Sequence, residues 1–412
     1  MRSAIVLGGG MAGIGAALHL QGRGWSVALV DKGEPGRETS YGNAGIIQSE
    51  AVEPYAMPRD WPRLFSIAAR RSNDVHWDLG GLRDNLGALL RYWWHSSPAR
   101  HETVSQAYAG LIARAVTEHE VLVAASGADR LVRQGGFRVL LCTQAAMDEA
   151  AANAERLRTR FGVRSLALSP AELAAAEPTL KQTGAGAIHW LDSWSVSDPG
   201  GLVAAYTQLF RRRGGTVRRG DAGTLKQGGA GWSVETADGP LDAEAAIVAL
   251  GPWSTGLLRR FGYRIPMVRK RGYHRHWRSA QAPSLPILDA ANGYVMAPMA
   301  KGLRITTGAE LSAAGPSVSP VQLARAEAAA GNLVDLGSPV DNAPWSGTRP
   351  CMPDMLPVIG EAPRHRGLWL HFGHGHQGFT LGPASGRLLA EAMSGERPFV
   401  PAEPFSPGRF RP

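Results

Sequence analysis

The sequence predicts an α/β fold, in part α+β, with two domains, and three observations support this class. The first is a strand, a glycine turn, a helix and a second strand over residues 4–31. The second is the run 245–250, which is apolar throughout, as in a strand that is covered on both faces. The third is strand-like sequence from residue 269 to residue 310. The first two predict one sheet, and the third predicts a separate one.

The opening unit carries a glycine pattern with a defined physical role. Gly8, Gly10 and Gly13 permit a tight turn, close approach of the backbone to a pyrophosphate, and close packing of the following helix on the strand. Asp31 ends the second strand, where its carboxylate can accept hydrogen bonds from both ribose hydroxyls and would repel a 2′-phosphate. The pattern predicts a dinucleotide site without deciding between NAD and FAD. A purely structural turn is the alternative interpretation.

Composition places the chain among ordinary globular proteins. It has 412 residues, of which 44% are apolar and 19% charged, so a folded core is expected rather than disorder. Cys142 and Cys351 are the only cysteines and lie far apart in the sequence. We therefore predict neither a disulfide framework nor a metal site.

The net charge of +9 bears on partners. Such charge can attract an anionic substrate or an anionic membrane surface, although scattered arginines more often form a solvated exterior. No basic stripe with interleaved aromatic residues indicates nucleic acid. The chain enters its first predicted strand after three residues, and no apolar run approaches the roughly 20 residues needed to span a bilayer. We therefore expect neither a cleaved signal nor a membrane span, and a cytoplasmic protein.

The middle of the chain alternates between helical and extended patterns. Residues 54–98 are rich in proline and tryptophan, and we expect these tryptophans to be buried, which would make the segment part of the fold rather than a linker. Helical patterns cover residues 82–94, 104–125, 145–161, 202–212 and 320–336, with a capped helix start at Ser169. Strand patterns cover residues 137–143, 216–217, 232–236, 272–277, 293–296 and 303–308.

A second cofactor signal follows the apolar strand 245–250. The turn Gly251–Ser254 lets the backbone pass close to a bound cofactor, which favours a flavin, and the alternative is a tight strand-to-helix turn. We predict a discontinuous cofactor domain with an inserted substrate domain, and a ligand in the cleft between them. The cofactor domain comprises residues 1–50, 195–265 and 345–412, and the substrate domain comprises residues 51–194 and 266–344.

Four motifs, in this order, resemble a known group of enzymes. They are residues 8–31, 38–46, 249–254 and 347–380. The group is the FAD-dependent amino-acid and amine oxidoreductases, which include D-amino-acid dehydrogenases, D-hydroxyproline dehydrogenases, glycine oxidase and sarcosine oxidase. The resemblance implies a Rossmann-like FAD-binding domain and an antiparallel-sheet substrate domain. It also implies noncovalent FAD, because Cys351 is offset from the position of the covalent link in sarcosine oxidases.

The resemblance assigns cofactor contacts to matching positions. In the family, the segment at residues 39–46 wraps the flavin pyrophosphate and ring edge, and the run at 376–380 lies at the pyrimidine end of the ring. Backbone N–H groups there could stabilise negative charge on the reduced ring. The expected contacts are Gly8, Gly10, Met11, Ala12, Gly13, Asp31, Lys32, Thr39, Ser40, Asn43, Ala44, Gly45, Ile46, Gly251, Trp253, His376, Gln377, Gly378, Phe379 and Thr380.

Three residues are expected at the substrate. Arg349 stands at the family's carboxylate-binding arginine, since a planar guanidinium grips a carboxylate through two hydrogen bonds, and a surface or domain-clamping arginine is the alternative. Tyr273 and His274 point to opposite faces of a strand, and we favour Tyr273 as the group that meets substrate over a plain sheet aromatic. Tyr294 is a weaker candidate. His374 is either catalytic or a satisfied core histidine.

The implied reaction is oxidation of a carbon–nitrogen bond in a D-amino acid or a cyclic imino acid such as D-hydroxyproline. A hydride moves to the flavin, and the imino acid hydrolyses to a keto acid. The electrons then pass to dioxygen, or to a quinone or a protein, with a peripheral membrane contact at the inner face. The alternatives are a glycine- or sarcosine-type oxidase, an oxidase of N-substituted amino acids, the flavin subunit of a heteromeric opine or hydroxyproline dehydrogenase, and a non-catalytic FAD-binding protein.

Overall fold

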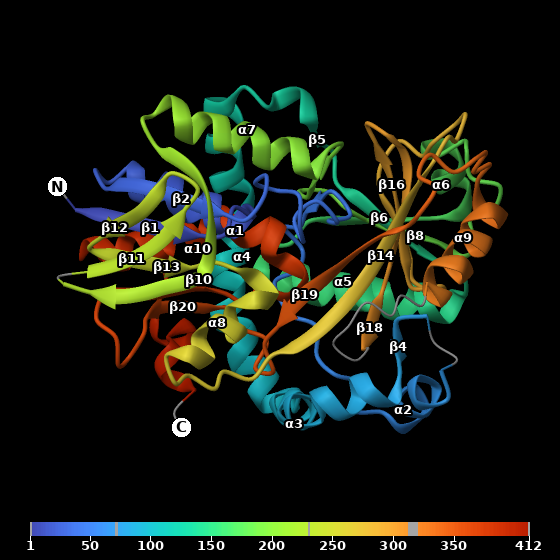
Figure 1. Ribbon diagram of the computed structural model, residues 1–412. Coiled ribbons are helices and arrows are strands. Elements are labelled where there is room, and N and C mark those ends of the chain that lie inside the picture. Colours follow the sequence, from blue (N-terminus) through green and yellow to red (C-terminus); the bar gives the residue numbers. More distant parts are fainter. Residues whose placement is uncertain (1, 71–72, 230, 312–319, 411–412) are drawn as a thin grey trace.

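The computed structural model describes residues 2–70, 73–229, 231–311 and 320–410, and it has two large sheets with helices packed around them (Figure 1). The predicted α/β fold class is confirmed. The predicted domain boundaries stay a prediction. In the described part of the chain, no helix combines the length and apolar character needed to cross a membrane.

The first sheet has eight strands, with β1 and β13 next to each other at its centre. The order is β12-β11-β10-β2-β1-β13-β21-β20. The pairs from β10 to β21 are parallel, and those at the two edges are antiparallel. Its strands are β1 (Ser3–Leu7), β2 (Ser26–Asp31), β10 (Thr216–Gly228), β11 (Gly231–Thr236), β12 (Gly239–Ala243), β13 (Ala245–Val248), β20 (Val358–Glu361) and β21 (Leu368–Phe372). The opening unit and the distant run at 245–250 are thus neighbours, as expected.

The second sheet is mostly antiparallel and has ten strands. Its order is β4-β18-β14-β17-β16-β15-β6-β8-β7, with β19 paired to β14. The strands are β4 (Val75–Trp77), β6 (Phe137–Leu141), β7 (Ser165–Leu168), β8 (Gly186–Trp190), β14 (Val268–Trp277), β15 (Ile287–Asp289), β16 (Tyr294–Met299), β17 (Gly302–Thr307), β18 (Ala309–Leu311) and β19 (Trp345–Cys351). A small sheet joins β3 (Ile46–Ile47), β9 (Trp194–Val196) and β5 (Val132–Gln134).

The helices flank both sheets. They are α1 (Met11–Gln21), α2 (Trp61–Ala68), α3 (Leu79–His95), α4 (Pro98–Ser126), α5 (Gln144–Phe161), α6 (Pro170–Ala176), α7 (Pro199–Arg212), α8 (Ser254–Arg260), α9 (Val321–Leu333) and α10 (Gly378–Ser394). Helix α6 begins with the predicted cap, because the Ser169 side chain accepts from the Glu172 N–H and the Glu172 carboxylate accepts from the Ser169 N–H. Helix α4 starts earlier than expected, at Pro98, since proline needs no N–H partner in a first turn.

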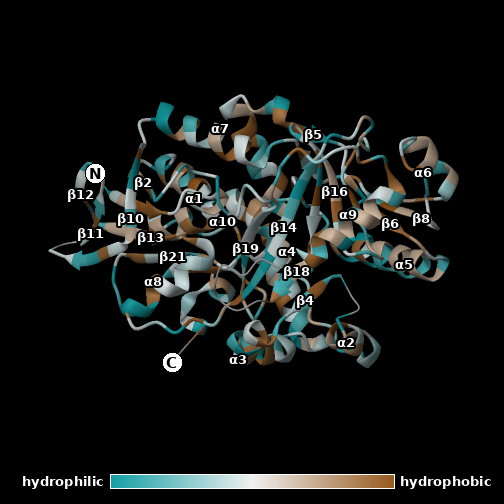
Figure 2. Cartoon of the chain, turned by 45° about the vertical axis from the view of Figure 1, so that its right-hand side comes forward, coloured by the Kyte–Doolittle hydropathy of each residue, from teal (hydrophilic) through white to brown (hydrophobic). Residues whose placement is uncertain are grey.

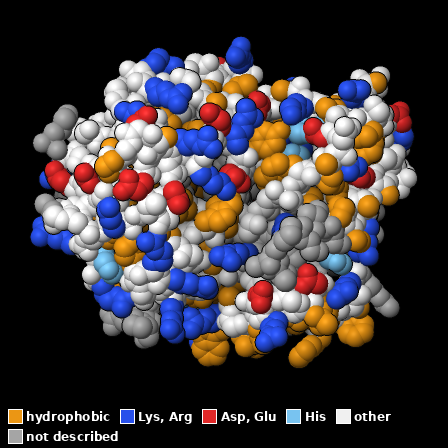
Figure 3. All heavy atoms as spheres, viewed as in Figure 1, with side chains coloured by type: hydrophobic (Ala, Val, Ile, Leu, Met, Phe, Trp, Pro, Cys, Tyr) orange, Lys and Arg blue, Asp and Glu red, His pale blue; other side chains and the backbone are white. Residues whose placement is uncertain are grey.

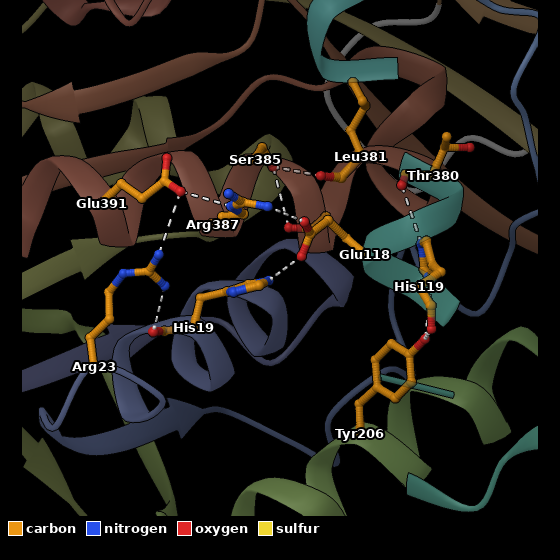
Figure 4. A network of polar contacts seen from close by, with 11 residues as sticks. His19, Arg23, Glu118, His119, Tyr206, Thr380, Leu381, Ser385, Arg387 and Glu391 are labelled. Carbon is orange, nitrogen blue, oxygen red and sulfur yellow. Dashed lines mark hydrogen bonds and ion pairs between the residues drawn. The ribbon is translucent and has the colours of Figure 1, made fainter. Parts of the chain in front are cut away.

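Helices α1 and α10 cross at very short range beside the first sheet. A Cβ on Gly15 would lie 2.5 Å from the Gly382 oxygen, so this crossing requires glycine. A polar network then ties both helices to α4 (Figure 4). Glu118 of α4 accepts from Arg387 at 2.8 Å and lies 3.5 Å from His19 of α1. These contacts hold α10 against α1 and α4.

The expectation of buried tryptophans in residues 54–98 is wrong for three of them. Trp61, Trp93 and Trp94 are 82%, 39% and 56% exposed. The inward face of α3 is occupied by other residues, including Leu89 and Tyr92, so Trp93 and Trp94 are left on the outside. The amphipathic pattern therefore predicted the helix correctly, but the burial of its tryptophans was predicted wrongly.

Candidate functional site

A cavity of about 1420 Å³ runs from the glycine turn to the second sheet. Its walls come from the turn after β1, the end of β2 and the start of α1 on one side, and from β14, β16, β17 and β19 on the other. Most of the predicted site residues line it: Gly8, Gly10, Met11, Ala12, Asp31, Lys32, Thr39, Ser40, Asn43, Ala44, Ile46, Gly251, Trp253, Tyr273, Arg349, His374, His376, Gly378 and Phe379.

The glycine turn has the geometry that the motif predicts. Gly8 has a φ of 106°, and a Cβ there would lie 2.6 Å from the Ala249 oxygen. A Cβ on Gly13 would lie 1.8 Å from the Gly8 oxygen, so Gly13 lies behind the cavity and serves the close packing of helix on strand. No side chain caps α1 at Gly10, although the Met11 N–H donates to the Ser40 hydroxyl at 3.0 Å. The N-terminus of α1 is thus directed at the cavity and suits an anionic phosphate.

Asp31 connects the turn to the end of β2. Its carboxylate accepts from the Gly9 N–H at 2.6 Å and from the Gly33 N–H at 2.9 Å. The next residue, Lys32, forms an ion pair with Glu38 at 3.1 Å. Because a carboxylate offers about four lone-pair sites, Asp31 retains capacity for further donors. Its role toward a ribose stays a prediction.

The segment at residues 39–46 is held by an arginine that the sequence analysis missed. Arg304 of β17 is buried, and its guanidinium donates to the Tyr41 carbonyl at 3.0 Å and to the Asn43 carbonyl at 2.5 Å. It also donates to His276, which lies 2.7 Å from Asp341. Burial lowers the pKa of Arg304 to about 10. The sequence held a signal for this residue, because Arg304 is the one charged residue in the predicted strand 303–308.

Hydrogen bonds within residues 39–46 also fix the conformation of this segment. The Asn43 side-chain oxygen accepts from the backbone N–H groups of Gly45 and Ile46 at 2.8 and 3.3 Å. Gly45 has a φ of 69°, and a Cβ there would lie 2.3 Å from the Val196 oxygen, which places Gly45 behind the cavity. The Thr39 hydroxyl donates to the Thr348 carbonyl at 3.1 Å, which links this segment to β19.

The turn after β13 agrees with both interpretations of its sequence, a strand-to-helix turn and a turn that lies beside the cavity. Residues Gly251–Trp253 form a 3-10 turn that leads directly into α8, so the strand-to-helix turn is real. Gly251 and Trp253 also line the cavity. Lys32 lies 4.7 Å from the centre of the Trp253 ring, which connects the turn to the end of β2.

The C-terminal run places the N-terminus of α10 at the cavity. Gly378 and Phe379 line it, whereas Gln377 and Thr380 lie behind it. The Gln377 amide donates to the Gln48 side chain at 2.6 Å, and the Thr380 hydroxyl accepts from the Gln48 N–H at 3.2 Å. The fixed N-terminus of α10 presents its positive dipole end to this part of the cavity.

The histidines of this run are neutral. Burial lowers the pKa of His374 to about 4 and holds the pKa of His376 well below its usual range. His374 and His371 both contact the Ser385 hydroxyl at 2.9 Å. His374 therefore has the contact of a satisfied core histidine and also lines the cavity, and its catalytic role stays a prediction.

Two cations line the far wall of the cavity. Arg349 of β19 donates to the carbonyls of Gly308 and Thr307 at 2.7 and 3.0 Å, and burial lowers its pKa. Lys270 of β14, which the sequence analysis missed, is its direct cross-strand partner. Lys270 lies 4.6 Å from the Tyr92 ring centre. Within the residues that the structure describes, neither cation forms an ion pair. This wall is thus suited to an anion.

Tyr273 and His274 lie on opposite faces of β14, and only the first lines the cavity. The Tyr273 hydroxyl donates to the Glu310 carboxylate, which lies 3.7 Å from Arg271. Burial, reinforced by this hydrogen bond, raises the pKa of Tyr273 to about 12. His274 stacks on Trp345 with ring centres 4.8 Å apart. The predicted contact of Tyr273 with substrate stays a prediction.

The fold and the cavity together define a dinucleotide-binding protein with a positively charged wall across from the cofactor end. Comparison with known proteins makes this class specific. The family described as FAD dependent oxidoreductase matches residues 3–392. The chain belongs to this family, and it is an FAD-dependent oxidoreductase.

Individual relatives match over nearly their whole length. The chain is 31% identical to the D-amino-acid oxidase of Bradyrhizobium diazoefficiens, covering 99% of each chain. It is 30% identical to the D-amino acid dehydrogenase of Paramagnetospirillum magneticum, covering 98% of each. Among solved structures, glycine oxidase from Geobacillus kaustophilus has a TM-score of 0.73 at 23% identity, with 98% of each chain covered. The similarity to glycine oxidase, at 23% identity, shows a shared fold alone.

The residues present fit FAD. Gly8, Gly9 and Gly10 line the cavity beside the N-terminus of α1, and a glycine backbone without side chains at a helix N-terminus suits a pyrophosphate. The cavity extends from there past Gly251 to the N-terminus of α10, which is suited to the polar edge of a flavin ring.

Proposed function

We propose that this chain oxidises a D-amino acid, or a cyclic D-imino acid such as D-hydroxyproline, to the imino acid and then the keto acid. The observation that carries the proposal is the pair Arg349 and Lys270 on the cavity wall opposite the cofactor end, two cations that form no ion pair with any residue the structure describes. A substrate carboxylate would supply the missing negative charge. The D-amino-acid oxidase and dehydrogenase relatives support the choice of substrate.

The residues of the wall would orient the substrate. The two backbone hydrogen bonds of Arg349 fix the plane of its guanidinium, and a carboxylate bound in that plane is fixed in angle as well as in position. Tyr273 lies beside it on β14, with its hydroxyl held by Glu310. With the carboxylate held, one face of the α-carbon points back along the cavity, and this selects between enantiomers.

Bound FAD would supply the two-electron acceptor for this oxidation, in which the α-hydrogen of the deprotonated amine would leave as a hydride and the nitrogen lone pair would form the C=N bond. The protein's contribution is orientation and charge. Burial lowers the pKa of His376 and of His374, which favours their neutral forms, so these side chains add no positive charge to that of Arg349 and Lys270. We further propose that FAD is bound noncovalently, because Cys351 lies behind the wall of the main cavity.

We also propose that the electrons pass to a quinone or a protein acceptor, from a cytoplasmic position at the inner face of the membrane. Support comes from the net charge of +9, which favours an anionic surface, and from the dehydrogenase relatives. Dye reduction under nitrogen, compared with peroxide formation in air, tests the acceptor. Rapid peroxide formation would assign dioxygen instead.

The substrate experiment uses flavin absorbance of the purified protein under nitrogen. D-proline, D-hydroxyproline, D-alanine, their L-enantiomers, glycine and sarcosine are added in turn. Bleaching by the D-compounds alone supports the proposal, whereas bleaching by glycine or sarcosine alone would assign the alternative substrates. A protein that stays yellow with every compound would contradict it. Acid precipitation, which releases only noncovalent flavin into the supernatant, tests the mode of attachment.

A further inference from the structure

Helices α2 and α3 carry a group of exposed apolar side chains, which we call the α2–α3 face. Trp61 and Phe65 belong to α2, and the other members belong to α3. The face comprises Trp61, Phe65, Leu79, Leu86, Leu90, Trp93 and Trp94. In Figure 3 hydrophobic side chains project from the lower edge of the molecule, where Figure 1 places α3 and α2. Figure 2 shows the same helices partly brown at the surface.

Helix α3 carries apolar side chains on two adjacent faces, one buried and one exposed. The inward face is buried and consists of Gly81, Asn85, Leu89 and Tyr92. The outward face consists of Leu79, Leu86, Leu90 and Trp93, at spacings of seven, four and three residues, which is the spacing of one helical stripe. A surface helix of a water-soluble protein needs only the first stripe. The second stripe therefore indicates an apolar partner outside the molecule.

Positive charge accompanies these apolar residues. Residues 59–100 contain seven arginines against four aspartates, with no lysine and no glutamate. Two of the arginines lie on the exposed tryptophans. Arg59 lies 3.8 Å from the ring centre of Trp93, and Arg100 lies 3.9 Å from that of Trp94. Arginine beside tryptophan and leucine is the composition of a segment that binds at the headgroup level of an anionic bilayer.

We propose that the α2–α3 face docks on the surface of an anionic phospholipid bilayer. Hydrophobic side chains project from the molecule at this edge (Figure 3). The exposed Trp61, Leu90 and Trp94 can therefore enter the headgroup region. Arg59 and Arg100, beside the tryptophans, can meet lipid phosphates. No part of this docking depends on the substrate.

The same two helices form part of the cavity wall. Leu64 and Ile67 of α2 and Leu82 and Leu89 of α3 line the cavity on their inward side. Docking would therefore bring the lipid within one helix layer of the cavity, so that a quinone dissolved in the bilayer has a short, apolar approach. This second step rests on the proposed function, whereas the docking does not.

The test is co-sedimentation of the full-length holoprotein with vesicles, without substrate. Vesicles of phosphatidylcholine are compared with vesicles of phosphatidylcholine and phosphatidylglycerol. The docking predicts binding to the anionic vesicles that weakens at high salt and falls about ten-fold in Leu90→Ser/Trp94→Ser. Arg91→Gln should lower it less. Leu166→Ser is the matched control, because Leu166 is 52% exposed in β7 and Leu90 is 62% exposed.

The possible results distinguish a lipid bilayer from a second copy of the chain as the partner of the α2–α3 face. Equal binding by the double variant, or an equal loss in Leu166→Ser, would overturn the docking. A dimer of the wild type in light scattering that the double variant converts to a monomer would assign the face to a second copy and also overturn it. Flavin reduction by substrate is measured in the same preparations with a water-soluble dye and should be unchanged. A protein that binds vesicles but reduces no flavin would keep the docking and reject the proposed function.

Discussion

The two ends of the cavity are built in different ways. At the cofactor end, the cavity is lined by the glycine turn, by the start of α1 and by the N-terminus of α10, and glycines there leave the backbone without side chains. At the substrate end, the contacts come from charged side chains on two paired strands, β14 and β19. A backbone site is encoded by a short stretch of sequence. A side-chain site depends on which residues strand register brings together.

The largest effect is expected from a change in the backbone site. Gly13→Ala would place a Cβ 1.8 Å from the Gly8 oxygen, and backbone on both sides cannot move aside. We expect flavin content to fall to near zero and the melting temperature to drop, as measured by absorbance at the flavin band and by thermal unfolding. Gly33→Ala is the control, since a Cβ there meets nothing within 4 Å. A Gly13→Ala protein with full flavin content would show that the turn is not the cofactor site.

If Gly13→Ala fails to fold, a milder variant keeps the comparison testable. Gly10→Ala would bring a Cβ to 3.2 Å from the Ser40 hydroxyl, which is a flexible side chain. We expect a folded protein with weaker flavin affinity. Titration of the apoprotein with FAD measures it, and unchanged affinity would contradict the assignment.

The contrast between the two ends explains what the sequence could predict. The strand–turn–helix unit at residues 3–21 is local, so its glycines determine both the fold and the site. The capped start of α6 is predictable for the same reason, because both partners of the cap lie within four residues. The family resemblance added Arg349, whose position in the cavity wall agrees with a role at the substrate.

The remaining features depend on contacts between distant segments. Lys270 can be recognised as a site residue only from its strand pairing with Arg349, 79 positions later in the chain. Arg304 can be recognised only from its hydrogen bonds to the carbonyls of Tyr41 and Asn43. The tryptophans were misjudged for a related reason. A helical pattern shows which residues share a face, but not whether that face meets protein, water or lipid.

The next largest effect tests the side-chain site. Arg349→Gln should lower kcat/KM for the amino-acid substrate by about 100- to 1000-fold, because a charged hydrogen-bonded pair is lost. Stopped-flow flavin reduction measures it. The amine that lacks the carboxylate should react equally slowly with wild type and variant, which confines the loss to carboxylate binding. Arg264→Gln, at an exposed arginine, is the control. A loss below about five-fold would exclude Arg349 as the carboxylate anchor.

A smaller effect is expected from His374, in the wall between the two ends. Its pKa is about 4 in the folded protein and near 6.5 when unfolded, so the unfolded chain binds the proton more readily. Its contribution to stability is therefore present above pH 6.5 and is lost as pH falls toward 4, by about 3 kcal/mol. Urea unfolding at several pH values measures this. His374→Gln should flatten the pH dependence, and His101→Gln should not. An unchanged slope in His374→Gln would show that the histidine is accessible to protons in the folded state.

The smallest effect separates the two cations at the substrate end. Lys270 offers a point charge, whereas Arg349 offers a planar pair of donors, so Lys270 should add attraction but little orientation. Lys270→Met should weaken binding of benzoate, a probe carboxylate, by about ten-fold, with kcat changed much less. The perturbation of the flavin spectrum measures this affinity. Lys270→Arg should restore most of it, and Lys226→Met, at an exposed lysine, should have no effect. If Lys270→Met binds benzoate like the wild type, Arg349 holds the carboxylate alone, and the cross-strand pair is not a site.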